Sequence, residues 1–497
     1  MGNYFYDMIP AEELAQLRYI PTVSEFVGWI EQKWGDLPAV NDLENKYNYR
    51  QFCKRIARRR AFLNSLGLQK GDIVAIFDKN SIAAVELFLA ITSNGQTALI
   101  LPASLPAPAV VGCCAKFRIK ALFVRDEMKP LSEGAPSPVY STGSIADSEA
   151  PAVEVDKEDP AAIFFTGGTT GAPKGAILPH RALMRGAYNG CFAPGKQLGC
   201  HRYVCLLPLN HVFGLIRSTL SAFYTGAEWY AAEDMKTAVG SLHAIKPTIL
   251  VLVPGLCEIL LSLAQVHGPR FLGGQLKTII SGAANVPPKL MKEFDAIGIS
   301  LLAGYGMTEG ANLTSGNKDV RERPNSVGKI YPEQETKIVD GELWIKGDNL
   351  FLGYYGEPEK TAEAFSADGW LKTGDLARFD EDGYLYIVGR IKNIIILDNG
   401  ENISPEEIEE PFYKYAQVRD CLVSEVEKEG RKVIGIEILP RPEAVEGKSP
   451  EEIEAFFSAM VDEVNAIMPS THRIASVTIR KEDFKRTGSL KVARNQK

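Results

Sequence analysis

Glycines, hydroxyl side chains and one ammonium group gather in residues 166–175, directly after the apolar run Ala161–Phe165. Glycine lets a backbone approach an anion closely, while hydroxyl and ammonium groups donate hydrogen bonds to phosphate oxygens. The spacing is not that of the common nucleotide loops, because Lys174 is followed by Gly175 and no G-x-G-x-x-G occurs. An ordinary turn would explain one or two glycines. We therefore predict a phosphate-binding loop made of Thr166, Gly167, Gly168, Thr169, Thr170, Gly171 and Lys174.

Two further polar clusters follow apolar segments. In LLAGYGMTEG, residues 301–310, Thr308 stands beside Glu309, a pairing that suits a phosphate oxygen and the Mg²⁺ that neutralises it. A loop with a capping Glu is the alternative. In the TGD sequence, Asp375 could accept hydrogen bonds from both hydroxyls of a ribose, although Asp is also common in turns for local reasons. We expect Asp375 to lie in a tight turn.

The elements that must position these residues follow an α/β pattern. Helical spacing alternates with short apolar runs, which is typical of layered domains with mostly parallel strands. Residues 127–160, rich in Pro, Ser and Gly, predict an exposed loop. A polar, strand-rich section covers about 325–389. The expected strands are 73–77, 97–101, 161–165, 203–207, 248–253 and 278–281, and the expected helices are 47–66, 83–93 and 212–224.

From about residue 391 the chain has a second pattern of its own. It predicts strands over 394–397, 418–426, 432–439 and 475–479, and helices over 405–415 and 450–468. We therefore expect two domains, 1–390 and 391–497. The fold class is α/β, with a large layered N-terminal domain containing several sheets and a small, mobile α+β C-terminal domain.

Composition narrows the function. The net charge of −7 argues against a nucleic-acid binder, although residues 480–497 carry a local excess of five positive charges. The first residues lack a signal-peptide pattern, and no 18-residue window is apolar and free of Pro or charge. The eight cysteines form no C-x-x-C pair. We expect a cytoplasmic protein with reduced thiols, no integral membrane segment and no structural metal site.

Eight stretches, in this order, resemble the adenylate-forming (AMP-binding) enzyme superfamily, which includes acyl- and aryl-CoA synthetases, peptide-synthetase adenylation domains and luciferases. The resemblance spans residues 164–494, and the N-terminal 160 residues carry no motif. The stretches are FFTGGTTGAPKG (164–175), LPLNHVFGL (207–215), SGAANVP (281–287), GYGMTE (304–309), FLGYYGEPEKT (351–361), TGDLARFDEDGYLYIVGRIKNII (373–395), NGENISPEEIE (399–409) and KRTGSLKVAR (485–494).

This resemblance implies a role for each matched residue. The phosphate loop would hold the β- and γ-phosphates of ATP, and Thr308 would contact the α-phosphate. Lys491 would be the catalytic lysine, because a cation there stabilises charge that develops at the phosphorus. Lys392 would be the hinge about which the C-terminal domain rotates between two half-reactions. The remaining roles are adenine pocket (Ala283, Ala284), base stacking (Tyr305), Mg²⁺ (Glu309) and ribose (Asp375, Arg390).

The resemblance also indicates the class of acid. No FDxS-like Asp is present to pair with an α-ammonium group, so we expect an acid without one. His211 would be an aromatic gate, and we count it with the catalytic residues. The candidate walls of the acyl pocket are Phe213, Val253, Pro254, Gly282 and Gly304. The chain departs from the family pattern at Gly167, where Ser is usual, at Asn210, where an aromatic residue is common, and at Leu490, where Gly is usual.

The predicted function is ATP-dependent activation of a carboxylic acid to an acyl-adenylate, followed by thioester formation with CoA. ATP, Mg²⁺ and CoA are the expected cofactors. One alternative is transfer to the phosphopantetheine of an acyl carrier protein, whose thiol is chemically the same. A second is a regulatory protein that binds adenylate without turnover, which predicts loss of Lys491, Glu309 or Asp375. All three are present. The acid itself and the oligomeric state stay open.

Overall fold

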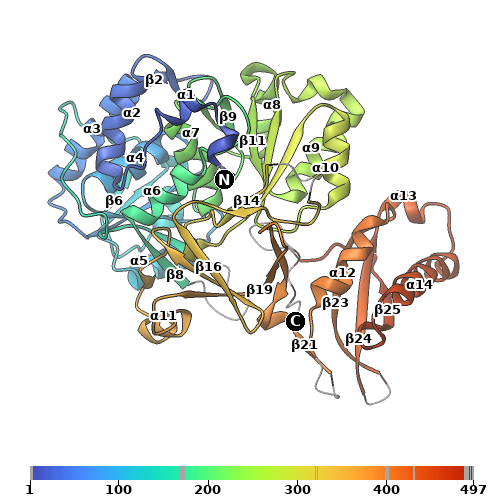
Figure 1. Cartoon of the computed structure of the whole chain (residues 1–497). Helices are drawn as coiled ribbons and strands as arrows, with labels where there is room; N and C mark the ends of the chain where they lie inside the picture. The colour runs from blue at the N-terminus through green and yellow to red at the C-terminus, as the bar shows by residue number, and fades with distance from the viewer. Residues whose placement is uncertain are drawn as a thin grey trace.

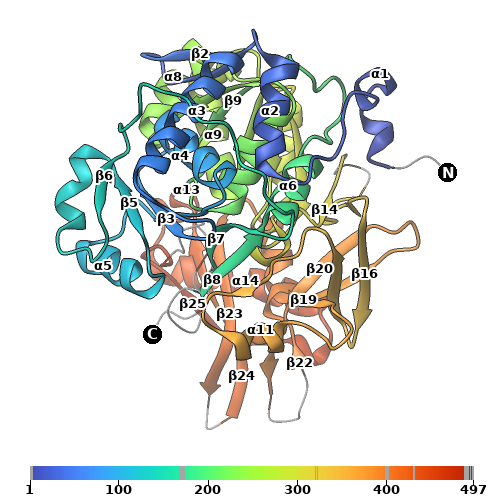
Figure 2. The ribbon, with the colours of Figure 1, turned by 90° about the vertical axis from the view of Figure 1, so that its left-hand side faces the viewer.

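A computed structural model describes residues 4–166, 174–318, 321, 323–397, 402–428, 431–485, 492 and 494. The chain forms a large body of sheets and helices, with a smaller C-terminal part beside it (Figure 1). A view from the side shows the same two parts, with the C-terminal strands extending away from the body (Figure 2). In the described part of the chain, no helix is long and apolar enough to cross a bilayer.

A seven-stranded sheet carries both ends of the predicted phosphate loop. Its order is β18-β8-β7-β4-β3-β5-β6. Only β8 runs opposite to the other strands, so it pairs antiparallel with both β7 and β18. The central strands are continuous apolar runs, as expected when both faces of a sheet are covered. The bounds are β3 Ile73–Phe77, β4 Thr97–Ile100, β5 Ala121–Val124, β6 Val139–Ser141, β7 Pro160–Thr166, β8 Lys174–Pro179 and β18 Gly353–Tyr354.

A nine-stranded sheet carries the second motif. Its order is β15-β14-β13-β12-β11-β9-β10-β1-β2, parallel from β13 to β1, with antiparallel strands at both edges. The bounds are β1 Pro38–Asn41, β2 Lys46–Asn48, β9 Arg202–Cys205, β10 Glu228–Ala231, β11 Ile249–Leu252, β12 Thr278–Ser281, β13 Ser300–Tyr305, β14 Ser315–Gly316 and β15 Lys329–Ile330.

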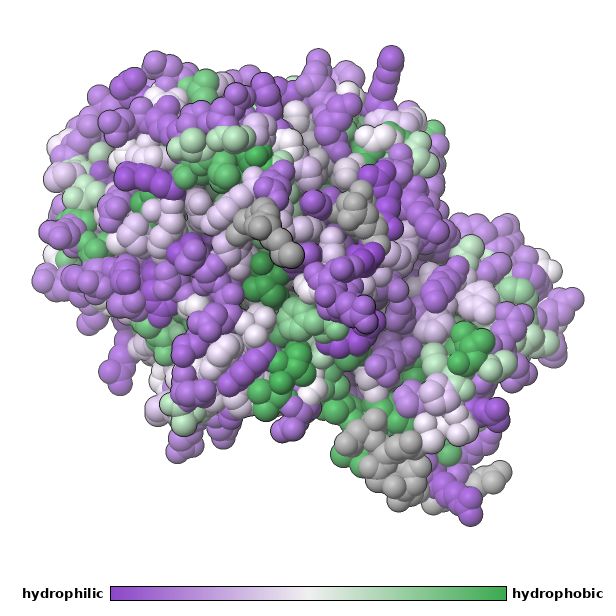
Figure 3. Space-filling view, viewed as in Figure 1, coloured by the Kyte–Doolittle hydropathy of each residue, from purple (hydrophilic) through white to green (hydrophobic). Residues whose placement is uncertain are grey.

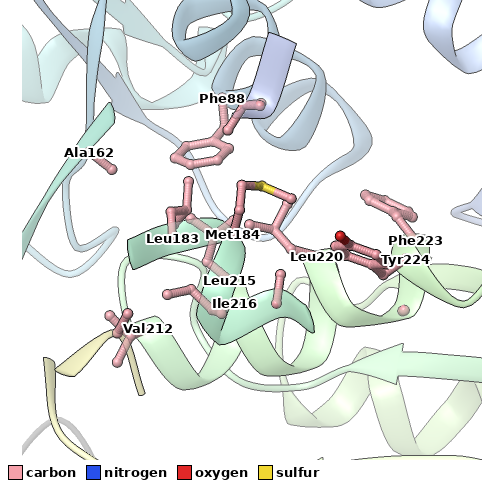
Figure 4. Close-up of a cluster of buried hydrophobic side chains, with 14 of the residues drawn as sticks. Phe88, Ala162, Leu183, Met184, Val212, Leu215, Ile216, Leu220, Phe223 and Tyr224 are labelled. Atoms are coloured by element: carbon pink, nitrogen blue, oxygen red, sulfur yellow. The ribbon is translucent and has the colours of Figure 1, made fainter. Parts of the chain in front are cut away.

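Helices pack in layers on these sheets. The largest core cluster joins side chains of both sheets to the helices between them (Figure 4). These inner helices are α2 Val23–Trp34, α3 Tyr49–Ser65, α4 Ile82–Ser93, α6 His180–Asn189, the π-helix η3 Phe213–Leu220 and α7 Ser221–Tyr224. Separate clusters hold helices on the outer faces, namely α5 Ala107–Lys116, α8 Met235–Ile245, α9 Pro254–His267 and α10 Pro288–Ala296.

A four-stranded antiparallel sheet, β16-β17-β19-β20, links the body to the C-terminal part. The C-terminal part has its own sheet, β23-β24-β25, and its own apolar core. The bounds are β16 Gln334–Val339, β17 Glu342–Gly347, α11 Pro358–Ala364, β19 Leu371–Phe379, β20 Leu385–Arg390, β21 Ile395–Ile396, β22 Asn402–Ile403, α12 Pro405–Glu409, β23 Val418–Lys428, β24 Arg431–Pro440, α13 Pro442–Val445, α14 Pro450–Ile467 and β25 Ile474–Ile479.

Polar contacts cross between the two parts. The Asn325 amide donates to Glu410 Oε1 at 2.6 Å, and the Ser404 hydroxyl donates to the carbonyl of Val388 at 2.8 Å. Hydrophilic residues cover most of the face shown in Figure 3, with small apolar patches among them. An inter-domain contact built from a few polar groups is what a part that changes position would use. The predicted boundary at residues 390 and 391 stays a prediction.

Most predicted elements are present, and the fold class is confirmed, with four local differences. Residues 127–160 are not all loop, because β6 pairs with β5. A strand, β8, follows the phosphate loop and pairs with β7, which the glycine pattern did not reveal. The expected helix 405–415 ends at Glu409 and continues as a 3₁₀ turn containing Pro411, whose backbone has no N–H to donate. Much of the helix expected over 212–224 is π-helical.

Candidate active site

Asp375 and Arg390 form the polar centre of the four-stranded sheet. They are directly paired residues on β19 and β20, and Arg390 Nε lies 2.6 Å from Asp375 Oδ1. The Tyr305 hydroxyl, at the end of β13, donates to Asp375 Oδ2 at 2.6 Å. Asp375 is only 2% exposed. Three residues that were predicted to surround the nucleoside are therefore in direct contact.

The prediction that Asp375 lies in a tight turn is wrong, because it lies inside β19. The strand is nevertheless kinked there. Gly374 has a φ of +70°, and the Asp375 amide donates to the Thr373 hydroxyl at 3.1 Å. Thr373 in turn donates to the carbonyl of Leu343 at 2.6 Å. The glycine supplies the left-handed conformation that the kink requires, and the pairing with β20 keeps the residue in the sheet.

The electrostatics of this cluster follow from its burial. Burial and the neighbouring Asp375 carboxylate raise the pKa of the Tyr305 phenol well above its usual range, so it remains a donor. Burial alone would lower the pKa of Arg390, but Asp375 and its other neighbours raise it above its ordinary value. The cluster thus combines the carboxyl group of Asp375 with a guanidinium and with a phenol that keeps its proton.

Glu309 is the centre of a second cluster. It lies in a short 3₁₀ turn, Thr308–Gly310, just after β13, and is 8% exposed. Tyr354 donates its hydroxyl to Glu309 Oε1 at 2.7 Å, and Lys174 Nζ lies 4.6 Å from the centre of the Tyr354 ring. Burial, and then the Glu309 carboxylate, raise the pKa of the Tyr354 phenol. Tyr354 thereby connects the predicted metal ligand to the lysine of the phosphate loop.

Strand pairing explains how these distant segments meet. Tyr354 pairs with Ala176 in β8, and Lys174 pairs with Thr166 across β7 and β8. Both ends of the phosphate loop therefore lie beside the Glu309 cluster. The loop residues between them, Gly167, Gly168, Thr169, Thr170 and Gly171, lie outside the described residues, as does Lys491.

The turn that carries Thr308 and Glu309 is tightly packed. A Cβ atom added at Gly306 would lie 1.1 Å from the carbonyl oxygen of Asn312, so only glycine fits at this position. Ala311 and Asn312 have positive φ angles, of 49° and 80°. Because the backbone folds back this closely, it restricts the direction in which the side chain of Glu309 points.

Lys392 interacts electrostatically with residues of both clusters. It belongs to a 3₁₀ turn, Ile391–Asn393, directly after β20. Burial and the neighbouring Arg390 lower its pKa, while Asp375 and Glu309 act in the opposite direction. The predicted hinge residue is thus within electrostatic range of both carboxylates. Because Lys392 interacts with both carboxylates, we treat the two clusters as two sides of one candidate site.

The predicted acyl-pocket residues meet only in part. A Cβ added at Gly282 would lie 3.1 Å from the carbonyl oxygen of Gly304 and 3.5 Å from the tip of the Phe213 ring. Val253 belongs to the same apolar core cluster as Phe213. Pro254 begins α9, and no described contact joins it to Gly282 or Gly304. Ala283 follows Gly282 with a positive φ of 65°, and Ala284 is partly exposed beside it.

His211 lies just before η3 and is partly buried. Its amide donates to the carbonyl of Pro208 at 3.1 Å, and the amide of Leu215 donates to its carbonyl at 2.9 Å. Burial lowers the pKa of its imidazole, so the ring is neutral at physiological pH. In the described part of the chain, its ring has no hydrogen-bond partner. Among the residues that the structure describes, His211 therefore has no proton-transfer partner.

Sequence reasoning missed three residues at or near this site. Tyr354 lies inside the FLGYYGEPEKT stretch, where an aromatic residue gave no chemical signal. The hydroxyl of Thr373 accepts a hydrogen bond from the Asp375 amide, but in the sequence Thr373 has the character of an ordinary turn residue. Arg217 is the one charged residue of the segment FGLIRSTL. A single charge in an otherwise uncharged segment is the sequence feature that could have drawn attention to it. Arg217 lines a small cavity with Gly304.

A larger cavity, of about 520 Å³, lies elsewhere and contains none of the predicted site residues. It is polar and lies among residues 42–47, 78–83, 125–127 and 230–237. Among the described residues, no group of three or more His, Cys, Asp or Glu side chains is arranged to hold a metal ion. The candidate active site is therefore the region near Tyr305, Asp375, Glu309, Lys174 and Lys392, and not this cavity.

Two large sheets with helices between them and on their outer faces, together with the small C-terminal part, define the fold of the adenylate-forming enzymes. The family model of the AMP-binding enzymes matches residues 29–355, and that of the AMP-binding enzyme C-terminal domain matches residues 392–497. The chain therefore belongs to the AMP-binding enzymes.

Curated relatives of this chain are CoA ligases. It is 30% identical over 419 residues to 4-coumarate–CoA ligase-like 3 of Oryza sativa subsp. japonica, which covers 73% of this chain and 70% of that protein. It is 29% identical to a feruloyl-CoA synthase of Amycolatopsis sp., over 76% of this chain and 79% of that protein. An anthranilate CoA ligase solved with anthranoyl-AMP has the same fold, with a TM-score of 0.84, 22% identity and 97% of each chain covered.

Proposed function

We propose that this chain is an AMP-forming carboxylate–CoA ligase, which activates a carboxylic acid with ATP and transfers the acyl group to the thiol of CoA. The observation that carries the proposal is the contact of Asp375 with both Arg390 and Tyr305, next to the cluster of Glu309, Tyr354 and Lys174. One side of the site offers acceptors and an aromatic ring to a nucleoside. The other offers a cation and a carboxylate to phosphates and their metal.

The chemistry of each group supports its role. Asp375 is an acceptor-only carboxylate at a buried position and would bind the ribose hydroxyls together with Arg390. Tyr305 presents a ring that a purine can stack on, and Ala283 and Ala284 would line the adenine pocket. Lys174, with Thr166 at the other end of the loop, would hold the β- and γ-phosphates, and Thr308 would contact the α-phosphate.

Glu309 fits the Mg²⁺ that accompanies ATP. Among the described residues, its carboxylate accepts a hydrogen bond from Tyr354 at Oε1 and forms no ion pair, so an oxygen remains for a hard cation. When bound, Mg²⁺ neutralises charge on the phosphates of the leaving pyrophosphate. The one protein carboxylate would suffice because phosphate oxygens and water supply the other ligands.

Lys491 and Lys392 would serve the two half-reactions. Lys491 would stabilise the charge that develops as the acid carboxylate attacks the α-phosphate and pyrophosphate leaves. Rotation about Lys392 would then remove Lys491 and bring the segment around residues 399–403 to the site, where the thiol attacks the acyl-adenylate and AMP leaves. His211, Phe213, Val253, Pro254, Gly282 and Gly304 would surround the acyl group.

The experiment that tests this proposal measures AMP and thioester from a panel of aliphatic and aromatic acids, with ATP and Mg²⁺, with and without CoA. Acid-dependent CoA thioester with stoichiometric AMP is the expected result. Acid-dependent pyrophosphate exchange without a CoA thioester would redirect the proposal to the phosphopantetheine of a carrier protein. No exchange with any acid would contradict a ligase and favour a protein that binds adenylate without turnover.

A further inference from the structure

Arg217 is a charged side chain buried in the core of the body. It lies in η3, whose other residues are apolar or carry only a hydroxyl, and it is 2% exposed. An arginine side chain stays protonated in proteins, so this position holds a permanent positive charge. Taking such a charge out of water costs several kcal/mol unless a partner compensates it.

The described residues supply Arg217 with no such partner. No ion pair joins it to an Asp or Glu in the described ranges, and its Nη1 is buried without a hydrogen-bond partner. Its polar neighbours include the phenols of Tyr203 and Tyr331 and the thiol of Cys191. Burial raises the pKa of each of these groups, and the guanidinium opposes the rise, for Tyr203 also through a side-chain hydrogen bond. A neutral phenol cannot balance the charge.

Three other buried arginines of the same body have described acceptors, and two of them pair with a carboxylate. Arg59, which is 1% exposed, has Glu86 Oε2 at 2.8 Å from its Nη2. Arg185, which is 6% exposed, has Asp348 Oδ2 at 3.2 Å from its Nη2. Arg60, which is 5% exposed, has no ion pair among the described residues, but its Nε donates to the carbonyl of Ala150 at 3.0 Å and its Nη1 donates to the Ser93 hydroxyl at 3.1 Å. Each of these three guanidinium groups therefore has a described acceptor. At Arg217 the compensating group is missing from the described protein atoms.

Arg217 lines a cavity that adjoins the candidate active site. Its lining includes Gly304, the predicted acyl-pocket wall next to Tyr305, together with the apolar side chains of Ile280 and Leu302. Lys318 also lines it, so the lining contains two basic side chains and no acidic one. The cavity measures about 30 Å³, which leaves room for a small polar group and not for a long alkyl tail.

The N-terminal segment contributes Phe5 and Met8 to the lining of this cavity. The ring of Phe5 stacks on that of Tyr331, with 4.1 Å between their centres, and both rings are buried. The amide of Lys318 donates to the hydroxyl of Tyr4 at 3.0 Å. A group in this cavity therefore meets aromatic walls and positive charge.

We propose that Arg217 binds a second carboxylate, at the end of the acid opposite the one that is activated, so that the substrate is a dicarboxylic acid. This inference rests on the proposed ligase function. A carboxylate accepts two parallel hydrogen bonds from the planar guanidinium. It also supplies the negative charge that the described residues near Arg217 do not provide. An alkyl or neutral aryl end would leave the guanidinium unpaired in an apolar cavity, which costs binding energy.

The test is acid-dependent ATP–pyrophosphate exchange with matched pairs of acids. Each pair is a dicarboxylic acid and the monocarboxylic acid of equal length, from succinate and butyrate to adipate and hexanoate, with terephthalate and 4-methylbenzoate as the aromatic pair. We expect kcat/KM of the unaltered protein to favour one dicarboxylate over its partner by about 100-fold or more. In Arg217→Met, which keeps an unbranched apolar side chain and removes the charge, we expect this preference to vanish or invert.

Two further variants separate charge from folding. Arg217→Lys keeps the charge but loses the planar fork, and should retain part of the preference. Arg185→Met removes an equally buried arginine that has a partner, and should lower the melting temperature while leaving the acid preference unchanged. The dicarboxylate should raise the melting temperature of the unaltered protein, and not that of Arg217→Met, because only the former can bind its second carboxylate.

The outcomes also separate this inference from the ligase proposal. Exchange that favours monocarboxylic acids, or a preference for neutral hydroxylated acids, would overturn the role of Arg217 and leave the ligase intact. An unchanged dicarboxylate preference in Arg217→Met would do the same. Exchange with no acid in any variant would overturn the ligase proposal, and the inference with it.

Discussion

Asp375 and Arg390 face each other on adjacent antiparallel strands, and the carboxylate that binds the guanidinium also accepts the hydroxyl of Tyr305 at 2.6 Å. One buried carboxylate thus orients two side chains that come from different sheets. Its second function, as an acceptor for a nucleoside, would depend on the same two oxygens.

Asp375→Asn tests this dual role. The amide keeps the shape but removes the charge that Arg390 requires, so we expect kcat/KM for ATP to fall by about 10- to 100-fold. Pyrophosphate exchange at varied ATP measures it. Asp380→Asn is the matched control, since Asp380 lies in the β19–β20 turn and pairs with Arg323. An equal loss in both variants would indicate damage to the sheet rather than to the site.

Glu309→Gln should lower adenylation by about 100-fold or more, because an amide is a poor ligand for Mg²⁺. Tyr354→Phe should have a smaller effect, of about 5- to 10-fold, by freeing the carboxylate to move. The measurement is the Mg²⁺ dependence of exchange. Tyr355→Phe controls for the loss of a neighbouring hydroxyl, which lies 3.4 Å from the carbonyl of Phe117. A Glu309→Gln variant with an unchanged Mg²⁺ requirement would contradict the metal role.

Gly306→Ala should disrupt the turn that carries Thr308 and Glu309. The added Cβ would lie 1.1 Å from the carbonyl oxygen of Asn312, so the backbone must move. We expect a loss of about 2–4 kcal/mol in unfolding free energy, together with most of the exchange activity. Gly298→Ala, at a site with open space but a φ of +79°, reports the cost of backbone strain alone. A Gly306→Ala protein of normal stability and activity would contradict this reading of the turn.

Lys491→Ala should separate the two half-reactions. Removing the cation should slow acyl-adenylate formation by about 1,000-fold, while thioester formation from added acyl-adenylate and CoA continues. Exchange and thioester assays on the same preparation make the comparison. Lys481→Ala, in the same basic tail, is the control for net charge. If adenylation were unchanged in Lys491→Ala, the role proposed for that lysine would be wrong.

His180 should make the fold sensitive to acid. Burial lowers the pKa of its imidazole to about 4, and Nδ1 accepts a hydrogen bond from the amide of Val23 at 3.2 Å. Between pH 6.5 and 4 the unfolded chain takes up a proton that the folded chain refuses, so stability falls as pH falls, by roughly 3 kcal/mol at most. His180→Asn keeps an acceptor for Val23 and cannot titrate. Denaturant unfolding from pH 7 to pH 4 should show a shallower loss for the variant, and parallel curves would refute this.

The sequence by itself determined the elements and the chemistry. Apolar runs such as 73–77 and 278–281 are strands at the predicted residues, because a strand buried on both faces must be continuously apolar. The glycine-rich and acidic motifs, in their order, identified the family that the comparisons confirm. Residue type carried this information because phosphate, metal and ribose each require particular donors and acceptors, whatever the distance between them along the chain.

Only the tertiary structure decided which groups meet. Tyr305 donates a hydrogen bond to Asp375 because the last residue of β13 lies beside β19 of the four-stranded sheet. Tyr354 reaches Glu309 because β18 pairs with β8. Periodicity records whether a side chain is buried and says nothing of its partner, since pairing across sheets depends on register. The same limit concealed Arg217. Its charge was visible in the sequence, but its burial beside Gly304 without a carboxylate follows from the packing of η3 against the sheets.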